Sequence, residues 1–191
     1  MWITRPADGI MRRRDEELPV YTRLGDVRAV AITQGQIGDI FQARGDYDEA
    51  LRTRRDEELP VYARLGDVYS VAVTQGKIAD ILVMRGDLNE ALRIRREVEL
   101  PVYERLGNIY NIAVTHGRIA DILQERGEFD EALRIRCEEQ LPAFIRLGDV
   151  SAIAITQGKI SGIADLLEAR GDLEKHCASD VTVKLTSQFQ R

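Results

Sequence analysis

The alternation of apolar and polar positions predicts paired amphipathic helices along the chain. In "VYSVAVTQGKIADILVMR", residues 68–85, three large apolar residues fall at seven- and four-residue spacings and share one helical face: Val71, Ile78 and Leu82. A row of small residues beside that face lets another helix approach closely: Ala72, Gly76 and Ala79. We expect Asp67 to cap the start of this helix and Gly86 to end it in the left-handed conformation.

A second helix is predicted directly after the first. It begins in "DLNEAL", where Asp87 and Glu90 have the spacing of a capping box, in which side chain and backbone satisfy each other's free groups. The same box recurs at two other places: Asp46 with Glu49, and Glu128 with Glu131. The helix continues through "EALRIRREVELPVYERL" and is expected to stop at Gly107.

This pair of helices repeats every 41 residues. Residues 66–106 and 107–147 share 24 identities in 41 positions without a gap. We expect six segments: a half unit over 1–24 with disordered first residues, full units over 25–65, 66–106 and 107–147, a partial unit over 148–173, and a degenerate capping helix or tail over 174–191. The partial unit holds three extra residues in "ITQGKISGIADLLEARGD", which displace the helical register by roughly 60°.

A proline lies within each predicted second helix, in "ELPVYTRLGD", "ELPVYARLGD", "ELPVYERLGN" and "QLPAFIRLGD". The four positions are Pro19, Pro60, Pro101 and Pro142. A proline inside a helix removes one hydrogen bond and crowds the carbonyl group four residues back. One bent helix is favoured, because Val61, Tyr62 and Leu65 continue the apolar face. The alternative is a break at Leu59 and a new helix that starts at Pro60.

A single pair of helices buries too little apolar surface to offset the conformational entropy lost when its residues become ordered. Each pair therefore needs a neighbour on both sides, which is the principle of a solenoid, a linear stack of repeated units. The sequence predicts an all-α fold of this kind, an α-solenoid built from antiparallel helix pairs.

The phrases "GDYDEAL", "GDLNEAL" and "GEFDEAL" resemble the tetratricopeptide repeat (TPR). In that family a small residue of the first helix packs against the alanine of this phrase. The matching small residues are Gly38, Ala79 and Ala120, the alanines are Ala50, Ala91 and Ala132, and the preceding core positions are Ile37, Ile78 and Ile119. The period is similar to that of the long-repeat TPR subclass of about 40–42 residues, seen in kinesin light chains and bacterial signalling proteins, rather than the ordinary 34. The resemblance covers roughly residues 7–173 and implies a right-handed superhelix of 41-residue repeats.

Two sets of residues depart from the TPR pattern. The aromatic residue expected midway along the second helix is arginine here: Arg54, Arg95 and Arg136. The tryptophan or leucine expected on the first helix is replaced by Gln34, Gln75 and His116. For His116, a packing or surface role is favoured over that of a ligand.

Composition and charge narrow the classes of function. The 191 residues are 44% hydrophobic and 31% charged, as in an ordinary globular protein. A formal net charge of −5 does not favour nucleic-acid binding, and no apolar run approaches the roughly 18 residues that span a bilayer. The N-terminus lacks the apolar centre of a signal peptide, and Cys137 and Cys177 have no ligand-like spacing. We expect a cytoplasmic protein without disulfide, metal or cofactor.

The sequence contains no catalytic motif. Glycine-rich phosphate loops, GxSxG, HExxH and paired CxxC patterns are missing. The Gly-Lys of "TQGKI" and the Gly-Arg of "THGRI" lie mid-helix without a flanking loop, so close helix packing explains the glycine better than phosphate binding does. His176 beside Cys177 is the one candidate pair for an enzyme, and we expect no enzymatic activity.

Arginines cluster on each second helix, as in "RIRRE". Glutamates follow four residues later, which pairs Arg54 with Glu58 and Arg95 with Glu99. A solvent-exposed face of mutually neutralised charges is favoured over a phosphate-binding stripe.

A ladder of carboxylates on the first helices is the pattern with most functional promise. In TPR proteins the first helices line a concave groove, so the resemblance implies a partner-binding groove at Ile32, Asp39, Gln42, Val73, Asp80, Val83, Val114, Asp121 and Gln124. The aspartates would attract a basic segment of a partner protein or peptide. The favoured alternative pairs Asp80 with Lys77 and Asp121 with Arg118 on the same helix. The carboxylate clamp of chaperone-binding TPR domains uses lysine and asparagine where glycine and aspartate stand here, so an acidic tail is not the expected ligand.

Near-identical units favour a non-enzymatic protein–protein interaction scaffold. A scaffold needs a repeated surface, whereas a catalytic site needs unlike residues that converge. An alternative is a structural element that forms a homo-oligomer by stacking through its uncapped ends. The chain also fits a fragment of a larger signalling regulator. Nucleic acid and membrane are not expected partners.

Overall fold

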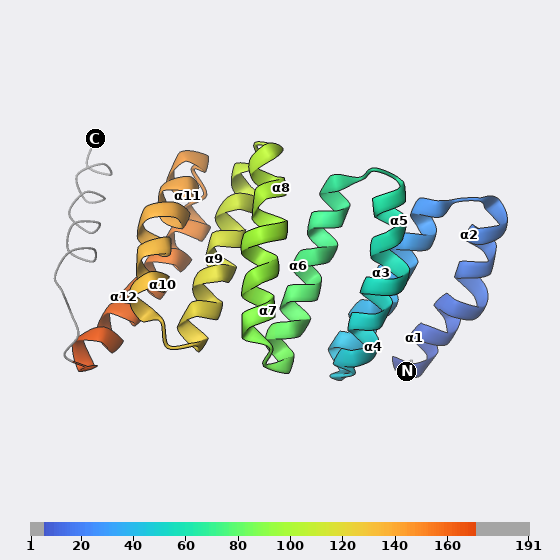
Figure 1. Cartoon of the computed structure of the whole chain (residues 1–191), viewed down its shortest axis with the longest axis horizontal. Helices are drawn as coiled ribbons and strands as arrows, with labels where there is room; N and C mark the ends of the chain where they lie inside the picture. Colours follow the sequence, from blue (N-terminus) through green and yellow to red (C-terminus); the bar gives the residue numbers. More distant parts are fainter. Residues whose placement is uncertain (1–5, 171–191) are drawn as a thin grey trace. The chain divides into compact units, whose positions relative to one another are not determined.

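The computed structural model describes residues 6–170, and every regular element in this part of the chain is helical (Figure 1). The chain divides into two compact units, unit 1 over residues 1–102 and unit 2 over residues 103–191. The predictions for residues 1–5 and 171–191, which include His176, Cys177 and the C-terminal capping helix or tail, lie outside the described residues.

The first helix of each predicted repeat is one long α-helix. The four helices are α3 (Val27–Arg44), α6 (Val68–Arg85), α9 (Ile109–Glu125) and α12 (Val150–Arg170). The side chains of Asp26, Asp67 and Asn108 cap the first three by accepting a hydrogen bond from the backbone N–H three residues on, at 2.9, 3.0 and 3.1 Å. Gly86 ends α6 in the left-handed region, with φ of 91°. The predicted caps at Asp67 and Gly86 are therefore confirmed.

The second helix of each repeat is continuous through its proline and contains a π-helical turn. The three complete second helices are α4 (Tyr47–Arg52), η2 (Thr53–Glu58) and α5 (Leu59–Arg64); α7 (Leu88–Arg93), η3 (Ile94–Glu99) and α8 (Leu100–Arg105); and α10 (Phe129–Ile135), η4 (Arg136–Gln140) and α11 (Leu141–Leu147). A helix of the same type precedes them as α1 (Pro6–Arg12), η1 (Arg13–Glu17) and α2 (Leu18–Leu24).

The π-helical turn explains how the helix accommodates its proline. The N–H of Leu59 donates to the carbonyl oxygen of Arg54, five residues back, and Leu59 keeps right-handed helical angles (φ −56°, ψ −45°). In a regular α-helix the ring of Pro60 would crowd the carbonyl group four residues back, and the wider turn moves that group away. The interpretation as one helix is therefore correct, and the alternative of a break at Leu59 is wrong.

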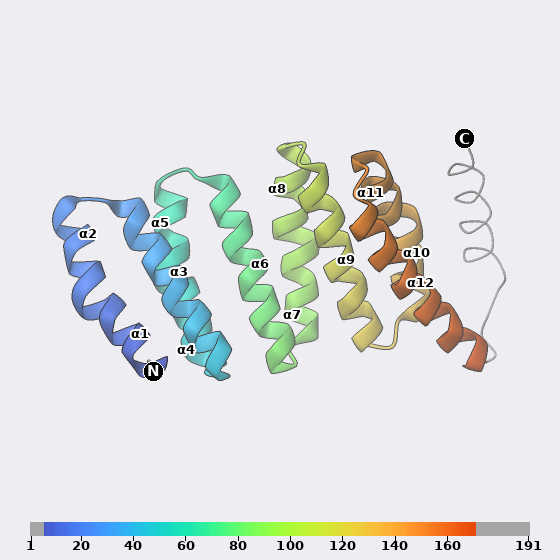
Figure 2. The ribbon, with the colours of Figure 1, turned by 180° about the vertical axis from the view of Figure 1, so that it is seen from behind.

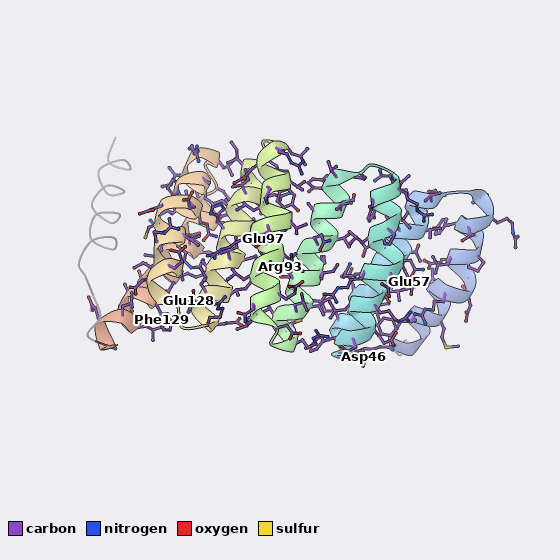
Figure 3. All side chains as sticks on the ribbon, viewed as in Figure 1. Asp46, Glu57, Arg93, Glu97, Glu128 and Phe129 are labelled. Atoms are coloured by element: carbon purple, nitrogen blue, oxygen red, sulfur yellow. The ribbon has the colours of Figure 1, made fainter. Side chains whose placement is uncertain are left out.

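The predicted capping boxes do not form. Asp46, Asp87 and Glu128 stand at the N-cap positions of α4, α7 and α10, but their side chains make no capping hydrogen bond. Figure 3 labels Asp46 and Glu128. The glutamates of the boxes instead contact an arginine three residues on, at 2.8 or 2.9 Å: Glu49 with Arg52, Glu90 with Arg93, and Glu131 with Arg134. The guanidinium group competes with the backbone N–H because its hydrogen bond to a carboxylate is charge-assisted on both sides.

The positions that carry the TPR resemblance form the core of each unit. In unit 1, Ala50 and Ala91 are fully buried, and so are Ile37, Ile78 and Ala79. In unit 2, Ala120, Ala132 and Ile119 are buried in the same way. Within unit 1, α3 and α6 lie on the face seen in Figure 2, and the second helices cover the opposite face seen in Figure 1.

The last first-type helix differs from the others. α12 has 21 residues, whereas α3 and α6 have 18, which matches the three extra residues in its sequence. Ile153, Ile160 and Ile163 bury one side of α12, and this side packs against α10 and α11. On the other side, a Cβ atom added to Gly158 or Gly162 would meet nothing within 4 Å. The described residues therefore leave one face of α12 uncovered.

Candidate functional site

Three arginines lie buried at the centres of the repeats. Arg54, Arg95 and Arg136 are at most 4% exposed, and they replace the aromatic residue of the TPR pattern. The predicted solvent-exposed face is therefore wrong for these three positions. Each arginine is the first or second residue of a π-helical turn. Glycines of the facing first helix lie against these polar side chains.

Each buried guanidinium group bridges two polar side chains. Arg54 donates through Nη1 to Glu58 Oε2 at 2.8 Å and through Nη2 to Asp39 Oδ1 at 2.5 Å. Arg95 makes the same two contacts with Glu99 and Asp80, both at 2.5 Å. The predicted pairs Arg54–Glu58 and Arg95–Glu99 thus exist, but they are buried. We call each set an arginine centre: Arg54 with Asp39 and Glu58, Arg95 with Asp80 and Glu99, and Arg136 with Asp121 and Gln140.

Glycines in the first helices make room for these centres. A Cβ atom on Gly35 would lie 2.8 Å from Glu58 Oε1, and one on Gly38 would lie 3.3 Å from the Cγ atom of Arg54. A Cβ atom on Gly76 would overlap the carboxylate of Glu99. The prediction that this glycine serves close helix packing agrees with these contacts, although its partner is a charged side chain instead of an apolar one.

The buried carboxylate of Glu58 also ties one repeat to the next. The hydroxyl group of Thr74, on α6, donates to Glu58 Oε1 at 3.0 Å. Burial raises the pKa of the Glu58 carboxyl above its usual value, and the charge of Arg54 together with the Thr74 hydrogen bond opposes that rise. The centre therefore links three helices of unit 1.

The third arginine centre has a neutral amide in place of the glutamate. Arg136 donates to Gln140 Oε1 at 3.0 Å and to Asp121 Oδ1 at 2.5 Å. Burial lowers the pKa of the Arg136 guanidinium, and the nearby Asp121 opposes that change. Lys159, on α12, contacts the same Asp121 oxygen at 2.5 Å.

The predicted pairings of the groove aspartates are wrong in detail. Asp80 accepts from Arg95, and Asp121 accepts from Arg136 and Lys159. Lys77 instead lies 3.6 Å from Asp39, one repeat earlier. The basic residue of the first helix reaches toward the preceding repeat because a lysine side chain is long enough to cross between adjacent first helices.

The nine candidate groove residues lie at or near the surface of their helices. In unit 1, Ile32 is 47% exposed, the Asp39 side chain is 53% exposed, and the remaining positions are half-buried: Gln42, Val73, Asp80 and Val83. In unit 2 the three positions are half-buried as well: Val114, Asp121 and Gln124. Each aspartate thus has one side toward solvent and one oxygen on a buried guanidinium group.

His116 is half-buried on α9, and its Nδ1 atom is buried without a hydrogen-bond partner among the described residues. Burial lowers the pKa of its imidazole, while the carboxylates of Glu139 and Glu104 oppose the change and Arg134 reinforces it. These features fit the predicted packing role.

The described residues contain no group of three or more His, Cys, Asp or Glu side chains placed to hold a metal ion. None of the helices described here is both long and apolar enough to cross a membrane.

The arginine centres were missed at the sequence level, although the signal was present. The sequence repeats a glycine, an arginine and a glutamate or glutamine at fixed positions. The glycines lie where a long polar side chain fits against a first helix: Gly35, Gly76 and Gly117. An arginine at an otherwise aromatic position, together with a glycine on the facing helix, would have indicated burial.

Two solved structures are similar to this chain. BtubC (BKLC) from P. vanneervenii is 14% identical, with a TM-score of 0.66 over 94% of this chain and 76% of that chain. A putative kinesin light chain from Podosopora anserina, described as nearly identical TPR-like repeats, is 15% identical, with a TM-score of 0.61 over 97% of this chain and 96% of that chain. No protein-family model matches the chain, and no curated protein matches it. The chain therefore has an all-α, TPR-like solenoid fold.

Proposed function

We propose that this chain is a non-enzymatic interaction module that holds a segment of a partner protein against its first helices. TPR-like folds commonly mediate protein–protein interaction. Among the described residues, the buried charged side chains pair with one another or with first-helix aspartates in the arginine centres. They are structural pairs, and no set of unlike reactive groups converges on a surface.

The observation that carries the proposal is the fixed position of the groove aspartates. Asp39, Asp80 and Asp121 each accept a hydrogen bond of 2.5 Å from a buried guanidinium group. A side chain that is held before binding loses little conformational entropy when a partner arrives. The same geometry in successive repeats offers a partner a regular row of fixed acceptors.

Basic side chains offset much of the negative charge that the carboxylates give to the proposed groove. In unit 1, the negative charges of Asp39 and Glu58 face the positive charges of Arg54 and Lys77. Attraction of a basic partner is therefore weaker than the aspartate ladder predicts. A partner that combines apolar side chains for Ile32 and Val73 with hydrogen-bond donors for the aspartates fits this surface better.

Site-specific photo-crosslinking tests the proposal. A photoreactive amino acid at Ile32, on the first helix, should crosslink to a partner in lysate, because this side chain is 47% exposed on the proposed groove. The matched control places the same amino acid at Arg52, whose side chain is 49% exposed on the second helix. Equal capture at both positions, or capture at Arg52 alone, would remove the groove assignment.

A substitution within the groove separates specific binding from non-specific adhesion to the chain. The variant Val73→Arg should reduce crosslinking at Ile32 by about tenfold, since a half-buried groove position would then carry a charge. Circular dichroism confirms that the variant is folded. Undiminished crosslinking in Val73→Arg would show that the captured protein does not lie along the proposed row.

A second candidate function is self-association through α12. Ile155 and Leu166 are exposed on this helix, and no described residue covers its Gly158 and Gly162. A helix of a second copy would cover this face in the way that the second helix of each repeat covers the corresponding glycines Gly35, Gly76 and Gly117. Sedimentation over a concentration series tests this candidate, and a monomer at every concentration would eliminate it.

A further inference from the structure

In each unit, exposed apolar side chains lie away from the proposed groove, at the connections that lead from a second helix to the next first helix. Ten of the sixteen large hydrophobic side chains exposed in the described part of the chain belong to the connections from a second helix to the next first helix. They are Leu24, Val27, Leu65, Val68, Tyr69, Leu106, Ile109, Tyr110, Leu147 and Val150.

The connections at the opposite end of the helices provide an internal comparison. Residues 44–47, 85–88 and 126–129 also contain arginine, glycine and an acidic residue, but none of their large apolar side chains is exposed. Phe129, labelled in Figure 3, is only half-exposed at the start of α10. Turn chemistry therefore does not require exposed apolar residues, and their presence at one end needs another explanation.

In unit 1 these side chains come from two adjacent connections. Arg28 Nη1, just after the α2–α3 connection, lies 2.7 Å from Asp67 Oδ2 in the α5–α6 connection. Both connections lie at the same end of unit 1, opposite the α3–α4 connection (Figures 1 and 2). We call the set Leu24, Val27, Leu65 and Val68 the apolar ridge of unit 1.

Two arginines beside the apolar ridge of unit 1 have no ion-pair partner among the described residues. Arg23 and Arg64 immediately precede Leu24 and Leu65, and no ion pair engages either of them among the described residues. The neighbouring acidic groups are occupied, since Asp26 caps α3 and Asp67 caps α6 while pairing with Arg28. At the opposite end, Arg85 is engaged by Asp48 and Asp87.

We propose that the apolar ridge of unit 1 docks an acidic amphipathic helix of a partner protein. Adjacent repeats are separated by two helix layers, roughly 16–20 Å, which a helix of about 12 residues spans. Leucine-type side chains on one face would contact Leu24 and Leu65, and carboxylates beside them would pair with Arg23 and Arg64. This surface is distinct from the proposed groove and does not depend on it.

The charges beside the apolar ridge disfavour two other occupants, a second copy of this chain and an anionic membrane. A second copy would bring the arginines of one ridge against those of another, which like-charge repulsion disfavours. Binding to an anionic membrane usually requires a cluster of four to eight basic residues, whereas this ridge has two unpaired arginines on a chain of net charge −5.

The test uses a designed probe. A fluorescein-labelled peptide of about 18 residues, with leucine on one helical face and glutamate on the other, is titrated against the full chain by fluorescence anisotropy. The double variant Leu65→Ser/Val68→Ser should weaken binding about tenfold, and Arg23→Glu/Arg64→Glu about as much. All four side chains are exposed, and circular dichroism verifies the fold. The control Met11→Ser removes an exposed apolar side chain that belongs neither to the ridge nor to the groove, and it should change nothing.

Several outcomes would overturn the proposal. They are equal binding of a scrambled peptide of the same composition, equal loss in Met11→Ser, or no binding at millimolar peptide. Ridge-dependent sedimentation with phosphatidylserine vesicles would assign the surface to a membrane. A ridge-dependent dimer would assign it to a second copy. The groove proposal is tested separately, by crosslinking at Ile32. A negative result with the ridge peptide therefore leaves the groove proposal intact, and a negative crosslinking result leaves the ridge proposal intact.

Discussion

The arginine centres of Arg54 in unit 1 and Arg136 in unit 2 share one geometry but not one charge. Both guanidinium groups are buried, both donate to an aspartate of the first helix at 2.5 Å, and both donate to a side chain four residues on. That side chain is the carboxylate of Glu58 in unit 1 and the amide of Gln140 in unit 2. The same hydrogen-bond geometry therefore forms whether the side chain four residues after the arginine is charged or neutral.

The difference changes what surrounds each centre. In unit 1, the extra negative charge of Glu58 is met by the hydroxyl group of Thr74 on the next first helix. In unit 2, the threonine at the equivalent place, Thr156, donates to its own helix, to the carbonyl oxygen of Ala152 at 2.8 Å. A neutral amide removes the need for that donor, and the contact of this centre with the next first helix is instead the one between Lys159 and Asp121.

Removal of the guanidinium group should give the largest difference in the free energy of unfolding between the two centres. Arg54→Met leaves Glu58 buried without its cation, and we expect a loss of about 3–5 kcal/mol in the free energy of unfolding. Arg136→Met leaves a neutral amide and an aspartate that still contacts Lys159, so we expect only about 1–3 kcal/mol. Urea unfolding followed by circular dichroism measures both. Equal losses would show that Glu58 and Gln140 are energetically equivalent.

Glycine substitutions should give effects of opposite sign. Gly35→Ala and Gly117→Ala place a methyl group against Glu58 and Gln140, which must then leave their arginines, and we expect a loss of about 1–3 kcal/mol. The added methyl group of Gly158→Ala on α12 meets no described residue within 4 Å and should stabilise by about 0.5–1 kcal/mol, because alanine favours a helix interior. Thermal unfolding of the three variants is the measurement. Stabilisation by Gly35→Ala would show that Glu58 moves aside without cost.

The variant Glu58→Gln converts the first centre into the chemistry of the second. We expect a change of at most about 2 kcal/mol at neutral pH, because one amide oxygen replaces a carboxylate that burial disfavours. The raised pKa of Glu58 means that the folded chain binds this proton more tightly than the unfolded chain. Its contribution to stability is therefore largest at low pH and is lost as pH rises through the window above the usual glutamate pKa.

Unfolding free energies of the wild type and Glu58→Gln, measured from pH 4 to 8, test this sign. The difference between them should shift in favour of the wild type as pH falls. The reciprocal variant Gln140→Glu should introduce the same dependence into unit 2. A difference that stays constant across the range would contradict burial as the dominant influence on Glu58.

The smallest effect concerns His116, which replaces the glutamine of the other first helices. Its lowered pKa means that the unfolded chain binds the proton more readily, so stability falls as pH drops below about 6.5. His116→Gln should remove this loss while changing the free energy of unfolding by less than about 1 kcal/mol at pH 7.5. Parallel denaturation at pH 5.5 and 7.5 checks the expectation, and an unchanged pH dependence would refute it.

Most of the fold was predictable because its signals are local. Asp67 and Gly86 mark helix ends through interactions within a few residues, and the alternation of apolar residues marks the buried faces. The capping boxes failed because Glu49, Glu90 and Glu131 had a competing partner, an arginine three residues on. The spacing in the sequence is compatible with both the capping box and the ion pair, and it does not decide between them.

The arginine centres were less predictable because they depend on tertiary contacts. On one helix, Arg54 and Glu58 have the spacing of a surface ion pair, and their burial follows only from Gly35 and Gly38 on the facing helix. The partners of Asp39, Asp80 and Asp121 come from other helices, so no pattern within the first helix identifies them. The groove residues themselves remain a prediction.

The wide turn before each proline has a consequence for how repeats of this length can change. The N–H of Leu59 already reaches one residue further back than in an ordinary helix. Losing a single residue there would swing everything downstream, including Val61 and Tyr62, by about 100° around the axis and out of the interior. Removing one residue from that turn should therefore disrupt the core of its repeat. By contrast α12, a first helix without a π-helical turn, carries its three extra residues within its length.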